Sequence, residues 1–403
     1  MSIPIVLFDG KERVRLLPIT FTRPVSYLRV GILTIKERWE RLCPNVTIYT
    51  LSPFYLQEEF TPILPHGEVF MINGSYIPTP QLVETIMVLK QDEALLDKAE
   101  NLIAFRGEFN VQYANFDVFL DNAQFSIHQK KYIETATKIN ALWDIFIQAD
   151  RWIRDDFALI TKGRTSASIS STNRIVGEEH IFIEEGAKVE FSILNATTGP
   201  IYIGKDAEIM ENCAIRGPFA LGEHAVLKMG AKIYGPTSLG PHCKVGGEVN
   251  NSIFIGFSNK AHDGFIGNAV IGEWCNLGAD TNNSNLKNTY DMVKLWSYET
   301  QSFVSTGLQF CGLIMGDHTK CSINTMFNTG TVVGVGCNLF GDGFHRNFIP
   351  SFTWGSPGHY EIYQIEKAFA SFEKVKERRN QHLTEAEKNM LRHVFELEKN
   401  QRR

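Results

Sequence analysis

Residues 201–245 read IYIGKDAEIMENCAIRGPFALGEHAVLKMGAKIYGPTSLGPHCKV. Within this stretch an aliphatic residue recurs at every sixth position, in the order Ile203, Ile209, Ile215, Leu221, Leu227, Ile233, Leu239 and Val245. The position four residues after several of these is small, as at Ala207, Cys213 and Ala225. A six-residue interval fits neither the helical period of about 3.6 residues nor the strand period of about 2. The chain is therefore expected to turn a corner about every six residues.

The same spacing returns at two later places, which are Phe265, Ile271 and Leu277 and then Met315, Cys321, Phe327, Val333 and Leu339. This pattern resembles the hexapeptide-repeat, left-handed parallel β-helix family. Coils that repeat at a fixed period bury a continuous core only between neighbouring coils. Residues 161–356 are therefore predicted to form a left-handed parallel β-helix.

The composition is that of an ordinary globular protein with room for two domains, at 403 residues and 43% hydrophobic. The net charge of -5, with no long basic run, argues against nucleic acid as a partner. The first residues lack a basic segment and an extended apolar run, so we expect neither export nor a membrane span, and a cytoplasmic protein. Four cysteines (Cys213, Cys243, Cys275 and Cys337) fall in the small-residue position of the repeat and are expected to be packed thiols.

The first 160 residues lack the repeat and predict an α/β, Rossmann-like domain. Short branched runs at 5–8, 46–49 and 69–72 predict buried strands, and helical spacing marks 32–42 and 80–89. Strands that alternate with helices imply a parallel sheet with its ligand site at the carboxyl ends of the strands. Residues 132–157 are predicted to be a helical bridge to the β-helix.

Three further segments depart from the repeat. The six-residue spacing lapses at 247–259 and 282–309, and both segments are expected to be loops on one face of the solenoid. Residues 357–403 carry a helical stripe and a capping box of Thr384 and Glu387. Two C-terminal helices are therefore expected to cover the open end of the last coil.

Residues 259–272 and 277–285 carry a more specific pattern, Asn-Lys-Ala-His-Asp-Gly-Phe followed by Leu-Gly-Ala-Asp-Thr-Asn-Asn-Ser-Asn. This resembles the acetyltransferase half of the bifunctional UDP-N-acetylglucosamine pyrophosphorylase / glucosamine-1-phosphate N-acetyltransferase family. The resemblance places His262 on the family's catalytic histidine and Asn285 on its substrate-binding asparagine. Phe265 stands where the family has a tyrosine that touches the sugar phosphate. Ala279 and Thr281 fall in the segment that the resemblance assigns to acetyl-CoA.

The family's basic pair is matched by Asn250 and Asn251, so phosphate would have to be bound by other residues. The nearby candidates are Lys228, Lys232, Lys244 and Lys260. Acetyl transfer to glucosamine-1-phosphate requires a neutral amine, and an imidazole can take the amine's proton. The alternative is that His262 is only a surface histidine.

Histidine spacing allows a third possibility. His224 and His242 lie one coil apart, and a count of one coil and a two-residue loop predicts that His262 lies in the same column. Imidazole is a common zinc ligand, so such a column could bind a metal, although stacked side chains of one kind are also usual in solenoids.

The N-terminal half resembles sugar-1-phosphate nucleotidyltransferases through Arg15-Leu16-Leu17-Pro18 and Thr22-Arg23-Pro24. The resemblance assigns nucleotide binding to Arg15, Arg23 and Asn73, and the alternative for the two arginines is that they form surface salt bridges in a domain that keeps only the fold. The family's glycine-rich phosphate loop is replaced by Lys11-Glu12-Arg13-Val14, and Asn73-Gly74-Ser75 lacks its magnesium-binding carboxylate. Mg²⁺ is therefore expected only if this domain is active.

The resemblance implies a transferase of UDP-N-acetylglucosamine biosynthesis that assembles as a homotrimer and binds acetyl-CoA between neighbouring solenoids. Acetyl transfer to glucosamine-1-phosphate is the expected reaction, with uridylyl transfer as a possible second step. Two alternatives stay open: a non-catalytic trimer that binds a sugar nucleotide, and an acyltransferase that acts on another amino sugar or nucleotide sugar.

Overall fold

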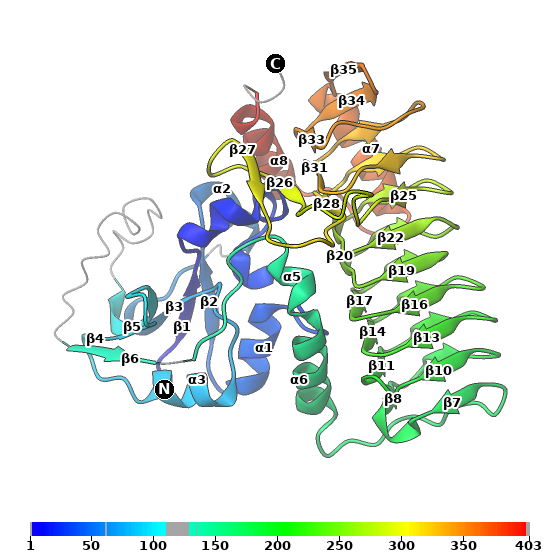
Figure 1. The fold of residues 1–403 in the computed structure, drawn as a ribbon. Helices are drawn as coiled ribbons and strands as arrows, with labels where there is room; N and C mark the ends of the chain where they lie inside the picture. The colour runs from blue at the N-terminus through cyan, green and yellow to red at the C-terminus, as the bar shows by residue number, and fades with distance from the viewer. Residues whose placement is uncertain (1, 61–62, 110–128, 134, 400–403) are drawn as a thin grey trace.

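A computed structural model describes residues 2–60, 63–109, 129–133 and 135–399. The N-terminal part is a six-stranded sheet in the order β2-β1-β3-β5-β4-β6 (Figure 1). Its strands are β1 (Ile5–Phe8), β2 (Ile48–Leu51), β3 (Gly67–Asn73), β4 (Glu93–Leu96), β5 (Leu102–Phe109) and β6 (Gln129–Tyr132). The predicted all-parallel sheet is wrong in one respect, because β5 runs antiparallel to both β3 and β4. The α/β class itself is confirmed.

The helices of this part begin where capping residues allow. Thr34 forms a capping box with Glu37 at the start of α1 (Ile35–Leu42), and Thr79 accepts a hydrogen bond from Leu82 N at the start of α3 (Pro80–Met87). The other helices are α2 (Phe54–Phe60), α5 (Asp144–Ile147) and α6 (Ala149–Thr161), with 3₁₀ turns η1 (Lys11–Leu16), η2 (Ile19–Phe21) and η3 (Val25–Tyr27). The bridge predicted as helical over 132–157 is helical only from Asp144 onward.

The second half is a parallel β-helix of three sheets, as the six-residue repeat predicts. The domain-facing sheet consists of β8 (Ile181–Ile183), β11 (Ile201–Ile203), β14 (Phe219–Leu221), β17 (Thr237–Leu239), β20 (Ile253–Gly256), β23 (Val270–Glu273), β28 (Leu313–Met315), β31 (Thr331–Val333) and β33 (Phe348–Ile349). The outer sheet consists of β7 (Arg174–Val176), β10 (Ile193–Asn195), β13 (Ala214–Arg216), β16 (Lys232–Tyr234), β19 (Glu248–Asn250) and β22 (Phe265–Gly267), and the pair β25 (Asn282–Asn283) and β30 (Met326–Phe327) follows in the later coils.

The third sheet, here called the α7-side sheet, consists of β9 (Lys188–Val189), β12 (Glu208–Ile209), β15 (Val226–Leu227), β18 (Lys244–Val245), β21 (Asn259–Lys260), β24 (Asn276–Leu277), β29 (Lys320–Cys321), β32 (Asn338–Leu339), β34 (Thr353–Ser356) and β35 (His359–Ile362). The aliphatic residues at every sixth position point into one buried core. All seven cysteines are buried free thiols, and burial raises the pKa of Cys243 to about 12.

The predicted loop at 247–259 is wrong. Residues 248–250, 253–256 and 259–260 are strands of a regular coil, and Ser238 pairs with Ile253 only 15 positions later. Earlier coils advance by 18 residues, as between Val226 and Lys244. A shortened coil shifts the phase of the repeat without leaving the β-helix.

The segment 282–309 does leave the coil. After β25 it forms an antiparallel hairpin of β26 (Lys294–Ser297) and β27 (Ser302–Ser305). Val293 and Leu295 join the core of the N-terminal part, and Glu299 pairs with Arg15 at 3.0 Å. The hairpin therefore fastens the later coils to the N-terminal domain.

The C-terminal helices are α7 (Ile365–Glu377) and α8 (Glu385–Leu397), and the predicted Thr384–Glu387 capping box is present. They do not cover the open end. Phe372 of α7 stacks on His318, and Arg379 just beyond it reaches Asn259, so the helix lies along the side of several coils. None of the described helices is long and apolar enough to cross a membrane.

The domain-facing sheet packs on the N-terminal domain, with α6 beside it (Figure 1). Ala220, Ile253, Val270 and Ile314 share one buried cluster with Trp152 of α6. This contact leaves the outer sheet and part of the α7-side sheet open for ligands or other subunits.

Candidate active site

His262 lies at the corner where β21 of the α7-side sheet turns into β22 of the outer sheet. Its side chain is exposed, and its imidazole forms no hydrogen bond or ion pair with another residue that the structure describes. The backbone of this corner is held firmly. The Lys260 ammonium donates hydrogen bonds to the carbonyl oxygens of His262 and Asp263, and Asp280 N donates to Asp263 O at 3.0 Å. The imidazole is thus carried by a fixed loop and is free to contact a ligand.

Lys260 itself lies inside the β-helix. It takes the inward position that Val245 holds one coil earlier, and only 1% of its surface is exposed. Burial lowers the pKa of its ammonium group to about 8, because desolvation disfavours the charged form. The prediction that Lys260 binds a substrate phosphate at the surface is wrong, since its ammonium is directed at the carbonyl groups of the His262 loop.

Two cavities meet at His262, and Ala261, His262 and Ala279 line both. The first, here called the corner cavity, has a volume of about 750 Å³ and also contains Lys228, Met229 and Asp280. The second, here called the basic cavity, has a volume of about 560 Å³. Its cationic side chains are Lys244, Lys320, Arg378 and Arg379. Both volumes fall in the range of sites for small ligands, roughly 300–1,000 Å³.

The structure places Lys228 and Lys244, but not Lys260, in these cavities. Lys232 projects from the outer sheet and lies 3.8 Å from Glu248. The cations Lys320, Arg378 and Arg379 were missed by the sequence analysis. They come from a later coil and from the end of α7, so no local spacing connects them with His262.

Phe265 and Asn285 lie together on the outer sheet. A Cβ added at Gly267 would lie 2.5 Å from the Phe265 ring and 2.8 Å from the Asn285 amide nitrogen, so both side chains lie over this glycine. Asn285 donates to Asn268 Oδ1 at 2.8 Å. Thr281, by contrast, is buried and donates to Gly278 O at 2.7 Å, which is a structural contact and not a surface available to acetyl-CoA.

The column was predicted to contain His262, but the structure leaves this histidine out of it. His224 stacks on His242 with ring centroids 4.9 Å apart, but the next ring is Phe257 at 4.8 Å. Trp274 and His318 continue the column. All five residues have a positive φ of 54–60° at the same kind of corner. The shortened coil places Phe257 where a histidine was expected, so the three histidines do not form the column that was considered as a possible metal site.

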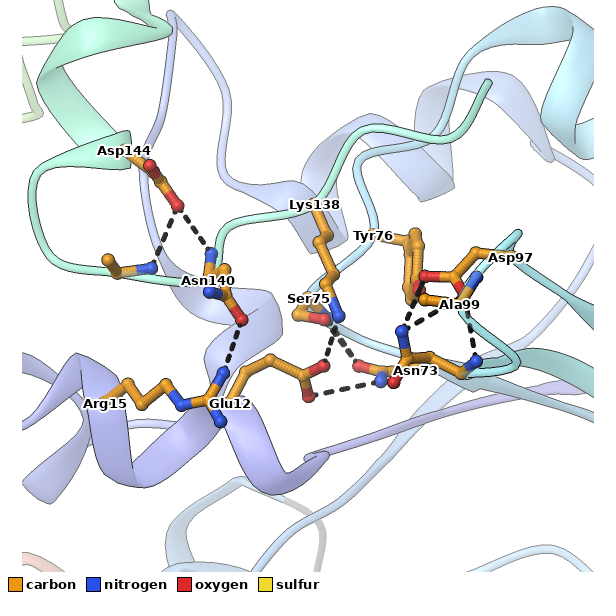
Figure 2. A network of polar contacts seen from close by, with 12 residues as sticks. Glu12, Arg15, Asn73, Ser75, Tyr76, Asp97, Ala99, Lys138, Asn140 and Asp144 are labelled. Carbon is orange, nitrogen blue, oxygen red and sulfur yellow. Dashed lines mark hydrogen bonds and ion pairs between the residues drawn. The ribbon is translucent and has the colours of Figure 1, made fainter. Parts of the chain in front are cut away.

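In the N-terminal domain, the place of a phosphate loop is taken by a carboxylate. Glu12 accepts a hydrogen bond from Lys138 at 2.8 Å and one from Asn73 at 3.4 Å, as Figure 2 shows. A side chain at Gly10 would collide with this carboxylate, so Glu12 lies directly over the glycine. Burial raises the pKa of Glu12, but the hydrogen bond and charge of Lys138, a backbone hydrogen bond and the hydrogen bond from Asn73 together outweigh it, and the pKa stays below its usual value. A negative charge at this position opposes binding of a nucleotide phosphate.

The residues assigned to nucleotide binding form ion pairs and hydrogen bonds with other residues of the chain. Arg15 pairs with Glu299 of the hairpin. It also donates to Asn140 Oδ1 at 2.9 Å, as Figure 2 shows. Arg23 is buried and pairs with Asp317 and Glu273 of the β-helix, so it joins the two domains and does not bind phosphate. Asn73 Oδ1 accepts hydrogen bonds from the backbone and hydroxyl of Ser75.

The donor set around Glu12 does not fit Mg²⁺. Nearby, Asp144 accepts two backbone hydrogen bonds, and Asp97 accepts hydrogen bonds from Tyr76 and Asn101 (Figure 2). Glu12 is neutralised by Lys138. Each of these three carboxylates already accepts at least two hydrogen bonds.

Comparison with known proteins gives three similarities. Residues 5–165 match the family model described as sugar nucleotidyl transferase. The chain is 33% identical over 90 residues to the bifunctional protein GlmU of Methanocaldococcus jannaschii. The aligned residues make up 22% of this chain and 21% of that protein. The chain thus spans about a fifth of the length of this curated relative. A solved structure of an Arabidopsis UDP-N-acetylglucosamine acyltransferase overlaps 58% of this chain and 90% of its own, at 11% identity and a TM-score of 0.29, which is too low to support an argument.

Proposed function

We propose that the protein acts in the biosynthesis of a sugar nucleotide, because residues 5–165 match the family model described as sugar nucleotidyl transferase, and that its own chemical step is acetyl transfer at His262. The observation that carries this proposal is the position of His262. An exposed imidazole without a described partner stands on a fixed loop between two cavities, and one of them is strongly basic.

In the proposed reaction the amine of glucosamine-1-phosphate attacks the thioester carbon of acetyl-CoA. His262 takes the proton from the amine as the new C–N bond forms, and the thiolate of coenzyme A leaves and is protonated. Lys228 in the corner cavity would bind the sugar phosphate, and Phe265 and Asn285 would contact the sugar ring on the outer sheet. Ala279 leaves room beside His262 for the thioester.

The arrangement in the N-terminal domain favours a structural role over uridylyl transfer. Glu12 occupies the space above Gly10, and Arg23 is used as a link between domains. This observation fits a non-catalytic N-terminal domain, but the carboxylate of Glu12 also opposes the sugar-nucleotide binding that the alternative of a non-catalytic trimer requires. An acyltransferase with another amino sugar as acceptor remains the second alternative, because Phe265 cannot offer the hydroxyl of the family's tyrosine.

We further propose a homotrimer that is formed through the open faces of the β-helix. Phe191, Met229 and Ile323 lie along the same corner as His262 and are 60–68% exposed. Large apolar side chains gathered on one edge are typical of a surface covered by another subunit.

The test is thiol release from acetyl-CoA with glucosamine-1-phosphate as acceptor, for the unaltered protein and for His262→Ala and His262→Gln. The proposal expects release that depends on the sugar phosphate and falls by about 100-fold in both variants, as for a lost general base. Lys205→Gln, a change at an exposed lysine, is the matched control. If the unaltered protein releases no thiol with this acceptor, the acceptor assignment fails.

A further inference from the structure

The basic cavity is built from two parts of the chain that are far apart in the sequence. Its floor carries the outward side chains of four neighbouring strands of the α7-side sheet, namely Lys244, Asn259, Asn276 and Lys320. Its roof is the end of α7 and the turn beyond it, with Val375, Arg378 and Arg379. One chain therefore makes both sides of the cavity.

The charge of this cavity is unbalanced. None of the described residues that line it is Asp or Glu, and none of its four cations forms an ion pair with a residue in the described part of the chain. Burial, and then the neighbouring Arg379, lower the pKa of Lys244. Burial and Arg378 lower the pKa of Arg379. Cations crowded together without a counter-charge repel one another, and a bound anion would relieve this repulsion.

The roof is held in place without a ligand. Arg379 Nη2 donates to Asn259 Oδ1 at 3.2 Å and to His242 O at 3.4 Å. The Lys320 ammonium lies 4.7 Å from the centre of the Phe372 ring and donates to His318 O at 3.0 Å. Lys376, one turn before Arg379, lies over Trp274 and pairs with Glu387 of α8. The cationic groups thus converge on a preformed cavity, which reduces the entropy lost on binding.

We infer that the basic cavity binds the phosphate groups of a nucleotide-type acyl donor within a single chain, under the chain's own helix α7. The inference rests on the proposed acetyl transfer for the identity of the donor. His262 lines the same cavity, so a donor whose phosphates contact Lys320 and Arg379 can extend its thioester end toward the imidazole. Phe257 and Trp274, stacked with centroids 4.3 Å apart, form an aromatic wall beside these cations. This location differs from the cleft between neighbouring solenoids that the family resemblance implies.

The test is calorimetric titration with adenosine 3′,5′-bisphosphate, which carries phosphates but no acyl group. Lys320→Met keeps the apolar stem on Phe372 and removes the charge, and Arg378→Gln removes the charge of an exposed residue at the end of α7. Each variant is expected to weaken binding by about 10-fold, as for the loss of one charged contact. Raising the salt concentration is expected to weaken binding to the unaltered protein.

The matched controls are Lys294→Gln and Arg346→Gln, which remove cations from a separate groove beside the hairpin. They are expected to leave binding unchanged. The inference is overturned if the unaltered protein does not bind the probe, if Lys320→Met and Arg378→Gln bind as tightly as the unaltered protein, or if only the controls weaken binding. Because the probe has no acyl group, the titration reports on the cavity whether or not acetyl transfer occurs. If the unaltered protein binds adenosine 3′,5′-bisphosphate but releases no thiol from acetyl-CoA, the proposed function is refuted and the inference about the cavity is not.

Discussion

Replacing Lys260 by methionine is predicted to abolish a pH dependence of stability that the buried ammonium causes. The pKa of Lys260 falls from 10.5 to about 8 on folding. Each pKa unit is worth about 1.4 kcal/mol, so this burial costs about 3 kcal/mol at pH 7. The folded state releases the proton at lower pH than the unfolded state, and the free energy of unfolding therefore rises with pH. Between pH 7 and pH 9.5 the calculated rise is about 2 kcal/mol.

The assay is urea denaturation of the unaltered protein and of Lys260→Met at several pH values. The difference between their unfolding free energies is expected to change by about 2 kcal/mol across this interval, in favour of the unaltered protein at high pH. Lys205→Met, at an exposed position, serves as the control and is expected to follow the unaltered protein. Parallel curves for Lys260→Met and the unaltered protein would refute the buried position of this ammonium. Thiol release by Lys260→Met is also expected to fall, because the His262 loop loses two hydrogen bonds.

Three further changes test other parts of the structure. Arg23→Met leaves the carboxylates of Asp317 and Glu273 without their cation. The free energy of unfolding, measured in urea, is therefore expected to fall by about 3–5 kcal/mol. A loss below about 1 kcal/mol would contradict the buried interdomain pair. Glu12→Ala removes the carboxylate that lies over Gly10. The affinity for UTP, measured by calorimetry, is expected to rise by about 10-fold because one repulsive negative charge is lost. An unchanged affinity would show that Glu12 does not exclude phosphate. Thr384→Ala removes the capping box of α8 and is expected to lower stability by about 1 kcal/mol in thermal denaturation, whereas Thr384→Ser should change it little.

The six-residue repeat was sufficient to predict the β-helix, because each aliphatic position must point into the same core. It failed at 247–259 for a physical reason. A coil can lose three residues at its corners and still pair its strands with the neighbouring coils, as Ser238 pairs with Ile253. After the shortened coil, counting in sixes from the earlier coils no longer identifies equivalent positions. For this reason Phe257, and not His262, stacks on His242 in the aromatic column. The shortened coil also turned Lys260 inward.

The candidate site was predicted only in part. His262 and Ala279 line both cavities, Lys228 lines the corner cavity and Lys244 lines the basic cavity, so these predicted residues lie near one another while their roles stay predictions. The basic roof could not be predicted, since it depends on α7 folding along the side of the coils and not over their end. Arg23 was assigned to nucleotide binding from its motif, but in the structure it pairs with Asp317. An arginine in a motif can pair with a distant carboxylate as readily as with a phosphate.

The rate of thiol release from acetyl-CoA, measured side by side for His262→Ala and Arg15→Gln, tests most directly whether acyl transfer takes place at the corner of the β-helix. We predict a fall of about 100-fold for His262→Ala and a change of less than about two-fold for Arg15→Gln, whose partners are Glu299 and Asn140. A full rate in His262→Ala would contradict acyl transfer at this corner.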